Sequence, residues 1–344
     1  MTGVNNKPPR VGLATASETI TDRARRAYEG FAEVVDPRGA TSRLTCVVDH
    51  GMFVRHGKLG RVGRGSLRSA GTGTRAGTGY VERQSRRDTL LLLPAEDAAG
   101  HTLVERELRT LLALQLIMDG WIPLHAGAVA TRSGEVILLM GPKMAGKTTA
   151  LLQLLQTGSY GLLSNDKTFV RAEAGQLVVR ALPVAAPIRG TVLHRFPPLG
   201  RLWRHRAELH VDNPETDVDT SAARLLVPVR LLARAFGAPV VSTGIVRAVI
   251  RLRHDPQRAS SRARTLDRNG LGRLFDSERL DFDPRWNRVW LGDEPAFVDS
   301  EAAASNRTAF MSCAGYWFTS APRDDDALLR FASSLPVETP DRAT

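Results

Sequence analysis

The stretch Gly141-Pro-Lys-Met-Ala-Gly-Lys-Thr-Thr149 decides the fold of this chain. Its first eight residues fit the pattern G-x-x-x-x-G-K-[ST], in which glycines let the backbone curl so that successive N–H groups face one anion. The apolar run Glu135 to Met140 precedes it and predicts a buried strand. The leucine-rich run Thr148 to Gln156 follows it and predicts a helix. A glycine turn between strand and helix is the simpler alternative, but these flanks favour a phosphate-binding loop.

A loop of this type assigns roles to individual side chains. The ammonium of Lys147 can reach the β and γ phosphates of a nucleotide, and the hydroxyl of Thr148 can ligate Mg²⁺. The expected cofactors are therefore ATP and Mg²⁺. The predicted cofactor-binding residues are Gly141, Pro142, Lys143, Met144, Ala145, Gly146, Lys147, Thr148 and Thr149.

Bulk composition predicts an ordinary globular protein. The 344 residues are 42% hydrophobic and 24% charged, which allows one large or two medium domains. The apolar stretches Thr89 to Leu93 and Thr110 to Met118 are too short to span a bilayer. The N-terminus carries no signal pattern, so we expect no membrane association and a cytoplasmic location. Cys46 and Cys313 lack metal-ligand spacing and are expected to be core residues.

The net charge of +11 raises the question of nucleic-acid binding. Arginines concentrate in two segments, Arg55 to Arg87 and Arg251 to Arg273, and either could be an anion-binding surface. Neither contains interleaved aromatic residues, a helix-turn-helix pattern or zinc-finger spacing. A solvated arginine-rich surface is therefore favoured over nucleic-acid binding, while an acidic peptide or nucleotide partner stays open.

Residues 1–100 are expected to form a smaller α+β domain. Val11 to Ala14 and Asp88 to Leu93 are predicted strands, and Thr21 to Val34 is a predicted helix. A predicted hairpin joins Leu44 to Val48 with Met52 to His56. A glycine- and arginine-rich loop is expected from Gly60 to Gly79.

Residues 101–335 are expected to form the phosphate-loop domain, followed by a polar tail at 336–344. Thr102 to Asp119 is a predicted helix with Gly120 as its stop, and a hairpin turn is predicted at Ser133-Gly134. The remaining expectations are strands at Ile122 to Ala130, Tyr160 to Leu163, Thr168 to Arg171 and Gln176 to Arg180, loops at Pro183 to Pro198 and Asp212 to Asp219, and helices at Leu225 to Phe236 and Asp326 to Ser334.

Two further side chains are candidates for the chemistry. Asp166 follows a predicted strand, and a strand returning beside the loop would bring its carboxylate close to Thr148, where Mg²⁺ binds. A turn or cap Asp is the simpler interpretation. His125 lies on the strand next to the one that enters the loop, although a lone His on an apolar strand is more often a core residue.

These motifs together resemble the kinase domain of HPr kinase/phosphorylase and its relatives, whose fold shares the phosphate-loop type of phosphoenolpyruvate carboxykinase. The resemblance covers Trp121 to about Arg180. It rests on Leu124-His125-Ala-Gly-Ala-Val, on the loop with its flanking strand, and on Gly161-Leu-Leu-Ser-Asn-Asp166. It implies an α/β fold with a mixed sheet of the HPr kinase type and phosphoryl transfer from ATP to a hydroxyl, typically of a serine. It also favours a homo-oligomer.

The resemblance assigns His125 to the acceptor side and the paired acids after the returning strand to metal binding and general-base catalysis. The relatives carry Asp-Asp where this chain has Asn165-Asp166. A carboxamide has no useful basicity, so Asn165 cannot take a proton, but its carbonyl oxygen can still ligate Mg²⁺. Lys143 replaces a small residue and adds positive charge at the loop.

The sequence therefore predicts an ATP-dependent kinase with a protein, peptide or small-molecule hydroxyl as acceptor. Its predicted catalytic residues are His125, Asn165 and Asp166, and its predicted metal ligands are Thr148 and Asp166. The alternative is a nucleotide-binding regulator or scaffold whose catalysis is weakened by Asn165.

Overall fold

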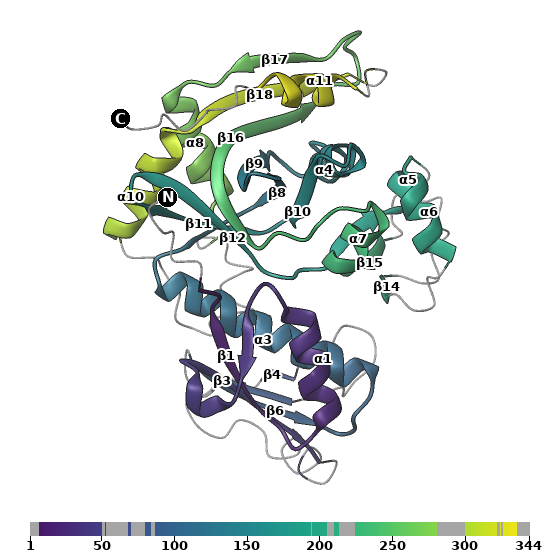
Figure 1. Ribbon diagram of the computed structural model, residues 1–344, viewed down its shortest axis with the longest axis vertical. Helices are drawn as coiled ribbons and strands as arrows, with labels where there is room; N and C mark the ends of the chain where they lie inside the picture. Colours follow the sequence, from purple (N-terminus) through teal and green to yellow (C-terminus); the bar gives the residue numbers. More distant parts are fainter. Residues whose placement is uncertain are drawn as a thin grey trace.

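Figure 1 shows the computed structural model of the chain. The structure describes residues 7–49, 52, 68–69, 80–83, 87–193, 195–204, 210–212, 224–280, 300–321, 324 and 326–335. Two sheets dominate it. One belongs to the N-terminal part and the other surrounds helix α4, with helix α3 between them (Figure 1).

The N-terminal sheet has the strand order β2-β1-β3-β6-β5-β4 in the described residues. Strands β2, β1, β3 and β6 run parallel, whereas β5 pairs antiparallel with β6. The expected α+β arrangement is therefore not confirmed, because parallel strands with helices between them are typical of α/β units. The elements are β1 (Arg10–Ala14), α1 (Glu18–Tyr28), β2 (Glu33–Val35), a 3-10 helix (Pro37–Gly39), β3 (Ser42–Val48), β4 (Arg68–Ser69), β5 (Tyr80–Arg83), β6 (Asp88–Leu93) and α3 (Ala98–Met118).

The predicted helix over Thr21 to Val34 is wrong in its second half. Helix α1 ends at Tyr28, Gly30 has a φ of 79°, and residues 33–35 form β2. The adjacent Val34 and Val35 favour a strand, and Gly30 with its positive φ ends the helix before them. The predicted hairpin and the glycine-rich loop at 60–79 lie largely outside the described residues.

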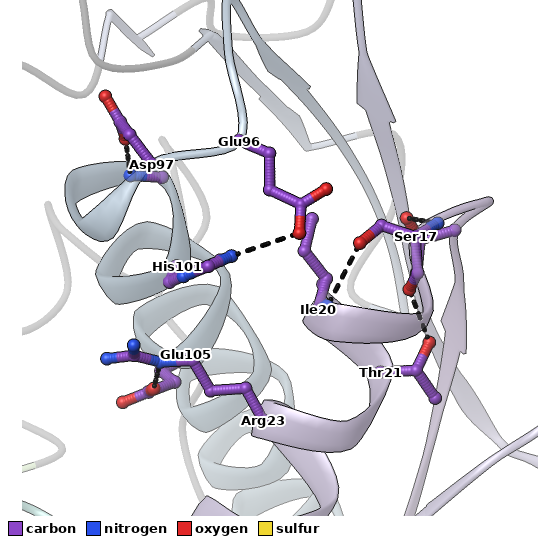
Figure 2. A network of polar contacts seen from close by, with 10 residues as sticks. Ser17, Ile20, Thr21, Arg23, Glu96, Asp97, His101 and Glu105 are labelled. Atoms are coloured by element: carbon purple, nitrogen blue, oxygen red, sulfur yellow. Dashed lines mark hydrogen bonds and ion pairs between the residues drawn. The ribbon is translucent and has the colours of Figure 1, made fainter.

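Helices α1 and α3 pack side by side, and polar contacts join the two helices and cap their first turns (Figure 2). Arg23 Nε donates to Glu105 Oε1 at 2.8 Å, and His101 Nε2 lies 3.4 Å from Glu96 Oε1. Asp97 Oδ1 accepts from the Gly100 amide at 2.7 Å and caps α3. Because this cap precedes Ala98, α3 begins earlier than the predicted Thr102.

The second sheet has the order β10-β8-β9-β16-β12-β11-β7, and β18 and β17 extend it beside β16. Strands β9, β16 and β18 are parallel, and the other pairs are antiparallel. The elements are β7 (Ile122–Leu124), β8 (Ala126–Thr131), β9 (Glu135–Met140), α4 (Lys147–Gln156), β10 (Tyr160–Ser164), β11 (Thr168–Glu173), β12 (Gln176–Ala181), β16 (Thr243–His254), β17 (Arg262–Thr265), α8 (Arg268–Glu278), α10 (Ser300–Met311), β18 (Ala314–Ser320) and α11 (Ala327–Ser334).

The predicted single strand from Ile122 to Ala130 is in fact two strands. Strand β7 pairs with β11 and β8 pairs with β9, although only His125 separates β7 from β8. Strand β7 lies at one end of the strand order and β8 lies second from the other end, so the sheet curls and brings the two regions together. The hairpin turn at Ser133-Gly134 is confirmed, with a φ of 87° at Gly134.

A small three-stranded sheet, β13-β15-β14, lies beside helices α5, α6 and α7. The predicted loop at 183–198 is wrong, because β13 (Ala186–Arg189), α5 (Gly190–Leu193) and the start of α6 (Pro197–Arg204) occupy it. The predicted helix at 225–236 is β15 (Arg224–Val227) followed by α7 (Val229–Ala235), with Pro228 at the boundary. Strand β14 (His210–Asp212) holds Asp212, and the acidic residues after it are not described.

The core of both units is apolar. Cys46 is 3% exposed within the N-terminal core, and burial raises the pKa of its thiol to about 12. Cys313 is only partly buried, although burial raises its pKa to about 12 as well. Among the described helices, none has the length and apolarity needed to cross a bilayer.

Candidate functional site

The glycine loop, residues 141–146, connects β9 to α4 at the centre of the curled sheet. Gly141 has a φ of 135°, and a Cβ at this position would lie 2.6 Å from the Leu252 carbonyl oxygen. Gly146 has a φ of 93°, and Met144, which is 68% exposed, has a φ of 72°. Only glycine fits the Gly141 position, since both the backbone angle and the neighbouring strand exclude a side chain. The strand-loop-helix prediction from the sequence is confirmed.

Lys147 is the first residue of α4, and its ammonium turns back into the loop. Nζ donates to the Gly141 carbonyl oxygen at 2.5 Å and to that of Pro142 at 3.3 Å, and the residue is only 8% exposed. Burial lowers the pKa of this ammonium, while the carboxylates of Glu278 and Asp166 act in the opposite direction. The ammonium is therefore held inside the loop, directed at the space that its backbone surrounds.

The other predicted loop residues differ in how far they are exposed. Pro142 and Lys143 are exposed, and Ala145 is buried. Thr148 and Thr149 lie half-buried in the first turn of α4, where backbone N–H groups are not used within the helix. The exposed pair lies on the solvent side of the loop, and the threonines lie at the helix start.

His125 and Asp166 are in direct contact. His125 Nε2 lies 3.0 Å from Asp166 Oδ1, with both side chains about one-third exposed. Strand β10 pairs antiparallel with β8, so the turn after β10 returns to the start of β8, where His125 stands. Gly127 permits this approach, because a Cβ there would lie 3.0 Å from the Asn165 carbonyl oxygen.

A second acidic residue completes this group, and no sequence pattern singled it out. Glu278, the last residue of α8, places Oε2 3.3 Å from His125 Nδ1, and its side chain is 11% exposed. The backbone fixes this position, since the His125 amide donates to the Glu278 carbonyl oxygen at 2.8 Å. The Leu280 amide likewise donates to the Pro123 carbonyl oxygen at 2.9 Å. The segment after α8 therefore runs along β7, and this pairing holds Glu278 beside the imidazole.

The two carboxylates determine the charge of His125. The hydrogen bond to Asp166, and after it the one to Glu278, raise the pKa of His125 to about 9 despite burial. Burial would raise the pKa of Asp166, but the hydrogen bond and charge of His125, together with Lys167 and Lys147, lower it. At neutral pH the imidazole is therefore protonated and the Asp166 carboxylate is ionised.

Asn165 lies next to Asp166 and is 6% exposed. Its Oδ1 is buried and has no hydrogen-bond partner in the described structure. A buried carbonyl oxygen without a donor is costly, and it is also a hard ligand of the kind that Mg²⁺ accepts. No cluster of three or more His, Cys, Asp or Glu suited to a metal occurs among the described residues. The oxygens of Thr148, Asn165 and Asp166 fit Mg²⁺ in their chemistry.

A cavity of about 370 Å³ adjoins the loop. Met144, Gly146 and Thr149 form its loop side, and Leu252 and Phe318 contribute apolar surface from β16 and β18. Polar groups from Gln153, Arg195, His254, Ser320 and Asp324 also line it. Its mixed lining and its position beside the start of α4 give it the character of a small-molecule site.

The geometry thus defines a mixed α/β chain with a glycine loop, a buried lysine and a Glu-His-Asp group. No protein-family model matches the chain, and no curated protein matches it. Among solved structures, the comparison found the HPr(Ser) kinase/phosphatase from Coxiella burnetii at 16% identity, over 42% of this chain and 75% of that chain. The TM-score of 0.22 is too low to carry an argument about this protein.

Proposed function

We propose that this protein is an ATP-dependent kinase that transfers the γ-phosphoryl group to a hydroxyl. The observation that carries the proposal is the position of His125. It lies between two carboxylates, and the charges of both carboxylates act on the ammonium of Lys147 in the glycine loop. A phosphate-binding cation and an ionised carboxylate with a fixed partner thus belong to one site.

In this proposal the nucleotide phosphates lie in the glycine loop. Backbone N–H groups at the start of α4 face the phosphates, and Lys147 exchanges its contacts with the Gly141 and Pro142 carbonyls for phosphate oxygens. The cavity beside Met144 and Thr149 receives the nucleoside part. Mg²⁺, held by Thr148 and Asp166 with Asn165 as a further oxygen donor, would neutralise charge on the phosphates.

The acceptor hydroxyl approaches from the side of Asp166. Its oxygen forms a bond to the γ-phosphorus as the bond to the β–γ bridging oxygen breaks, and ADP leaves. The hydroxyl proton passes to the Asp166 carboxylate, which is ionised at neutral pH. His125 is protonated in this state, so it orients Asp166 and offsets negative charge and does not itself accept the proton.

The acceptor is a hydroxyl of a protein, a peptide or a small molecule. The sequence resemblance favours a serine side chain. A homo-oligomer and a cytoplasmic location belong to the same proposal.

The test is transfer of label from γ-labelled ATP in the presence of Mg²⁺ and candidate peptides. We expect Lys147→Ala to reduce turnover by about a hundredfold or more, since it removes the cation that faces the phosphates. The matched control is Arg132→Ala, an exposed cation in the β8–β9 turn, which should leave turnover unchanged. Full turnover in Lys147→Ala would overturn the proposal.

One observation favours a second candidate, a nucleotide-binding regulator with weakened catalysis. Asn165 replaces the expected first acid, and its Oδ1 has no hydrogen-bond partner among the described residues. In that case wild-type protein binds ATP and transfers no label to any acceptor. Binding without transfer in the same experiment would favour this candidate over the kinase.

A further inference from the structure

The arginines that the sequence concentrates between 251 and 273 converge on one concave surface. A cavity of about 250 Å³ is lined by Arg253, Arg258, Arg262, Arg264, Trp317 and Thr319. These residues come from β16, β17, β18 and the β16–β17 connection, at the end of the molecule opposite the N-terminal sheet (Figure 1). We refer to this surface as the arginine pocket.

Strand pairing explains why these side chains share one face. Arg253, Thr319 and Arg262 lie directly across from one another on β16, β18 and β17, and Arg251, Trp317 and Arg264 form the next such row. Residues two apart on a strand point to the same face, with rows roughly 7 Å apart. The pocket is therefore built into the sheet and does not depend on a single mobile side chain.

The alternate residues on these strands face the other way. Leu252, His254, Phe318 and Ser320 line the cavity beside the glycine loop, whereas Arg253, Trp317 and Thr319 line the arginine pocket. The two cavities lie on opposite faces of the same strands. The arginine pocket is consequently a separate site from the one proposed for the nucleotide.

The pocket holds concentrated positive charge. No acidic residue lines it, and the structure gives its four arginines no ion pair among the described residues. The nearby acids are engaged elsewhere, since Asp255 accepts from the Gln257 amide and Asp324 accepts from Ser261 and Arg330. Guanidinium groups held together without counter-charges repel one another, so an anion that bridges them is stabilised there.

The lining also narrows the chemistry of the anion. The guanidinium carbons of Arg251 and Arg264 lie 4.4 and 4.8 Å from the centre of the Trp317 ring. Because two guanidinium groups already pack on this ring, it is poorly suited to stack against a nucleic-acid base. Four forked donors that converge from several sides match the oxygens of phosphoryl groups, which point in several directions, better than the two coplanar oxygens of a carboxylate.

We propose that the arginine pocket binds a compact oligophosphate anion, independently of the glycine loop. The size of the cavity suits a small molecule more than an extended polymer. The proposal does not depend on kinase activity.

The test uses inorganic tripolyphosphate and the full-length Lys147→Ala protein, in which the loop lacks its lysine. Calorimetric titration should show binding, and the added pair Arg253→Gln and Arg262→Gln should weaken it at least tenfold. The matched control is Arg25→Gln with Arg26→Gln, two exposed arginines of α1, which removes the same charge and should change affinity less than twofold. The melting temperature should not fall when Arg253→Gln and Arg262→Gln are added, because neither arginine has an ion-pair partner in the described structure and their removal relieves mutual repulsion.

Several results would overturn the proposal. One is that tripolyphosphate does not bind the Lys147→Ala protein. Another is that Arg25→Gln with Arg26→Gln weakens tripolyphosphate binding as much as the pocket pair does, which would show a general charge effect. Citrate binding as tightly as tripolyphosphate would indicate a carboxylate site. Tighter binding of a 20-base-pair duplex with the same dependence on Arg253 and Arg262 would show a nucleic-acid surface instead.

Discussion

Glu278 Oε2 lies 3.3 Å from His125 Nδ1, on the side of the imidazole opposite Asp166. This contact joins the end of α8 to the junction between β7 and β8, two segments far apart in the sequence. The imidazole is thereby fixed at both nitrogens. Its orientation toward Asp166 depends on Glu278 as well as on the sheet.

Replacing Glu278 tests this positioning role. In Glu278→Gln we expect the pKa of His125, measured by NMR titration of the imidazole, to fall below its value of about 9, because one of its two carboxylate partners is lost. In the proposed kinase, kcat should fall several-fold with little change in KM for ATP, and Glu278→Asp should restore part of it. Asp276→Asn is the control, since Asp276 lies in the same helix but pairs with Arg307. An unchanged imidazole titration in Glu278→Gln would contradict the role.

The raised pKa of His125 also predicts how stability depends on pH. The unfolded group titrates near 6.5 and the folded one near 9, so the folded state holds an extra proton between these values. The stabilisation from protonated His125 is therefore complete below pH 6.5 and is lost as the pH rises through 9. Denaturant unfolding should show that the free energy of unfolding of wild type exceeds that of His125→Gln by an amount that shrinks from about pH 6 to about pH 10. A difference that grows with pH would contradict the assigned charge.

Asn165→Asp should create a carboxylate that the site cannot readily accommodate. The position is 6% exposed and adjacent to ionised Asp166, so burial and like charge should raise the pKa of the new carboxyl group. The folded state then loses stability as the pH rises above the unfolded value of about 4. Melting temperatures at about pH 4 and about pH 8 measure this loss, and Asn269→Asp, at an exposed position, should lack it.

The same variant separates the two candidate functions. If Asn165 is adapted to the reaction, Asn165→Asp should lower phosphoryl transfer or leave it unchanged. A gain of tenfold or more would instead indicate that the wild-type protein is a weakened enzyme, in favour of the regulator.

Gly141→Ala should disrupt the glycine loop. Its Cβ would lie 2.6 Å from the Leu252 carbonyl oxygen, and the φ of 135° is unfavourable for alanine. We expect a loss of at least about 1–3 kcal/mol in the free energy of unfolding from backbone strain, with further loss from the contact. Gly134→Ala is a matched control, because its φ of 87° is also positive but no atom of the described part of the chain lies within 4 Å of the added Cβ. Equal losses in the two variants would show that Leu252 imposes no constraint.

Local signals in the sequence predicted the elements around the loop. The apolar run of β9, the glycine turn at 134 and the leucines of α4 each agree with what forms in the structure. Predictions failed where a glycine or proline changed the element within a run predicted as a single helix, as at Gly30 and Pro228. In these runs hydrophobicity alone does not distinguish a strand from a helix.

The site itself was predicted only in part. His125 and Asp166 were candidates from their motifs, but their direct contact depends on β10 pairing with β8. Glu278 was not predicted, because its proximity to His125 arises from pairing of the segment after α8 with β7. Such long-range pairing leaves no periodic signal near either residue. The roles of these residues stay predictions.

His125 is the single residue between β7, which ends the strand order on one side, and β8, which lies second from the other end. The imidazole therefore lies where the curling of the sheet brings β7 close to β8. A change in the curvature of the sheet would move β7 and β8 relative to each other, and the histidine with its two carboxylates would report that movement directly. The curvature of the sheet and the distances between His125 and its two carboxylates are therefore coupled in this protein.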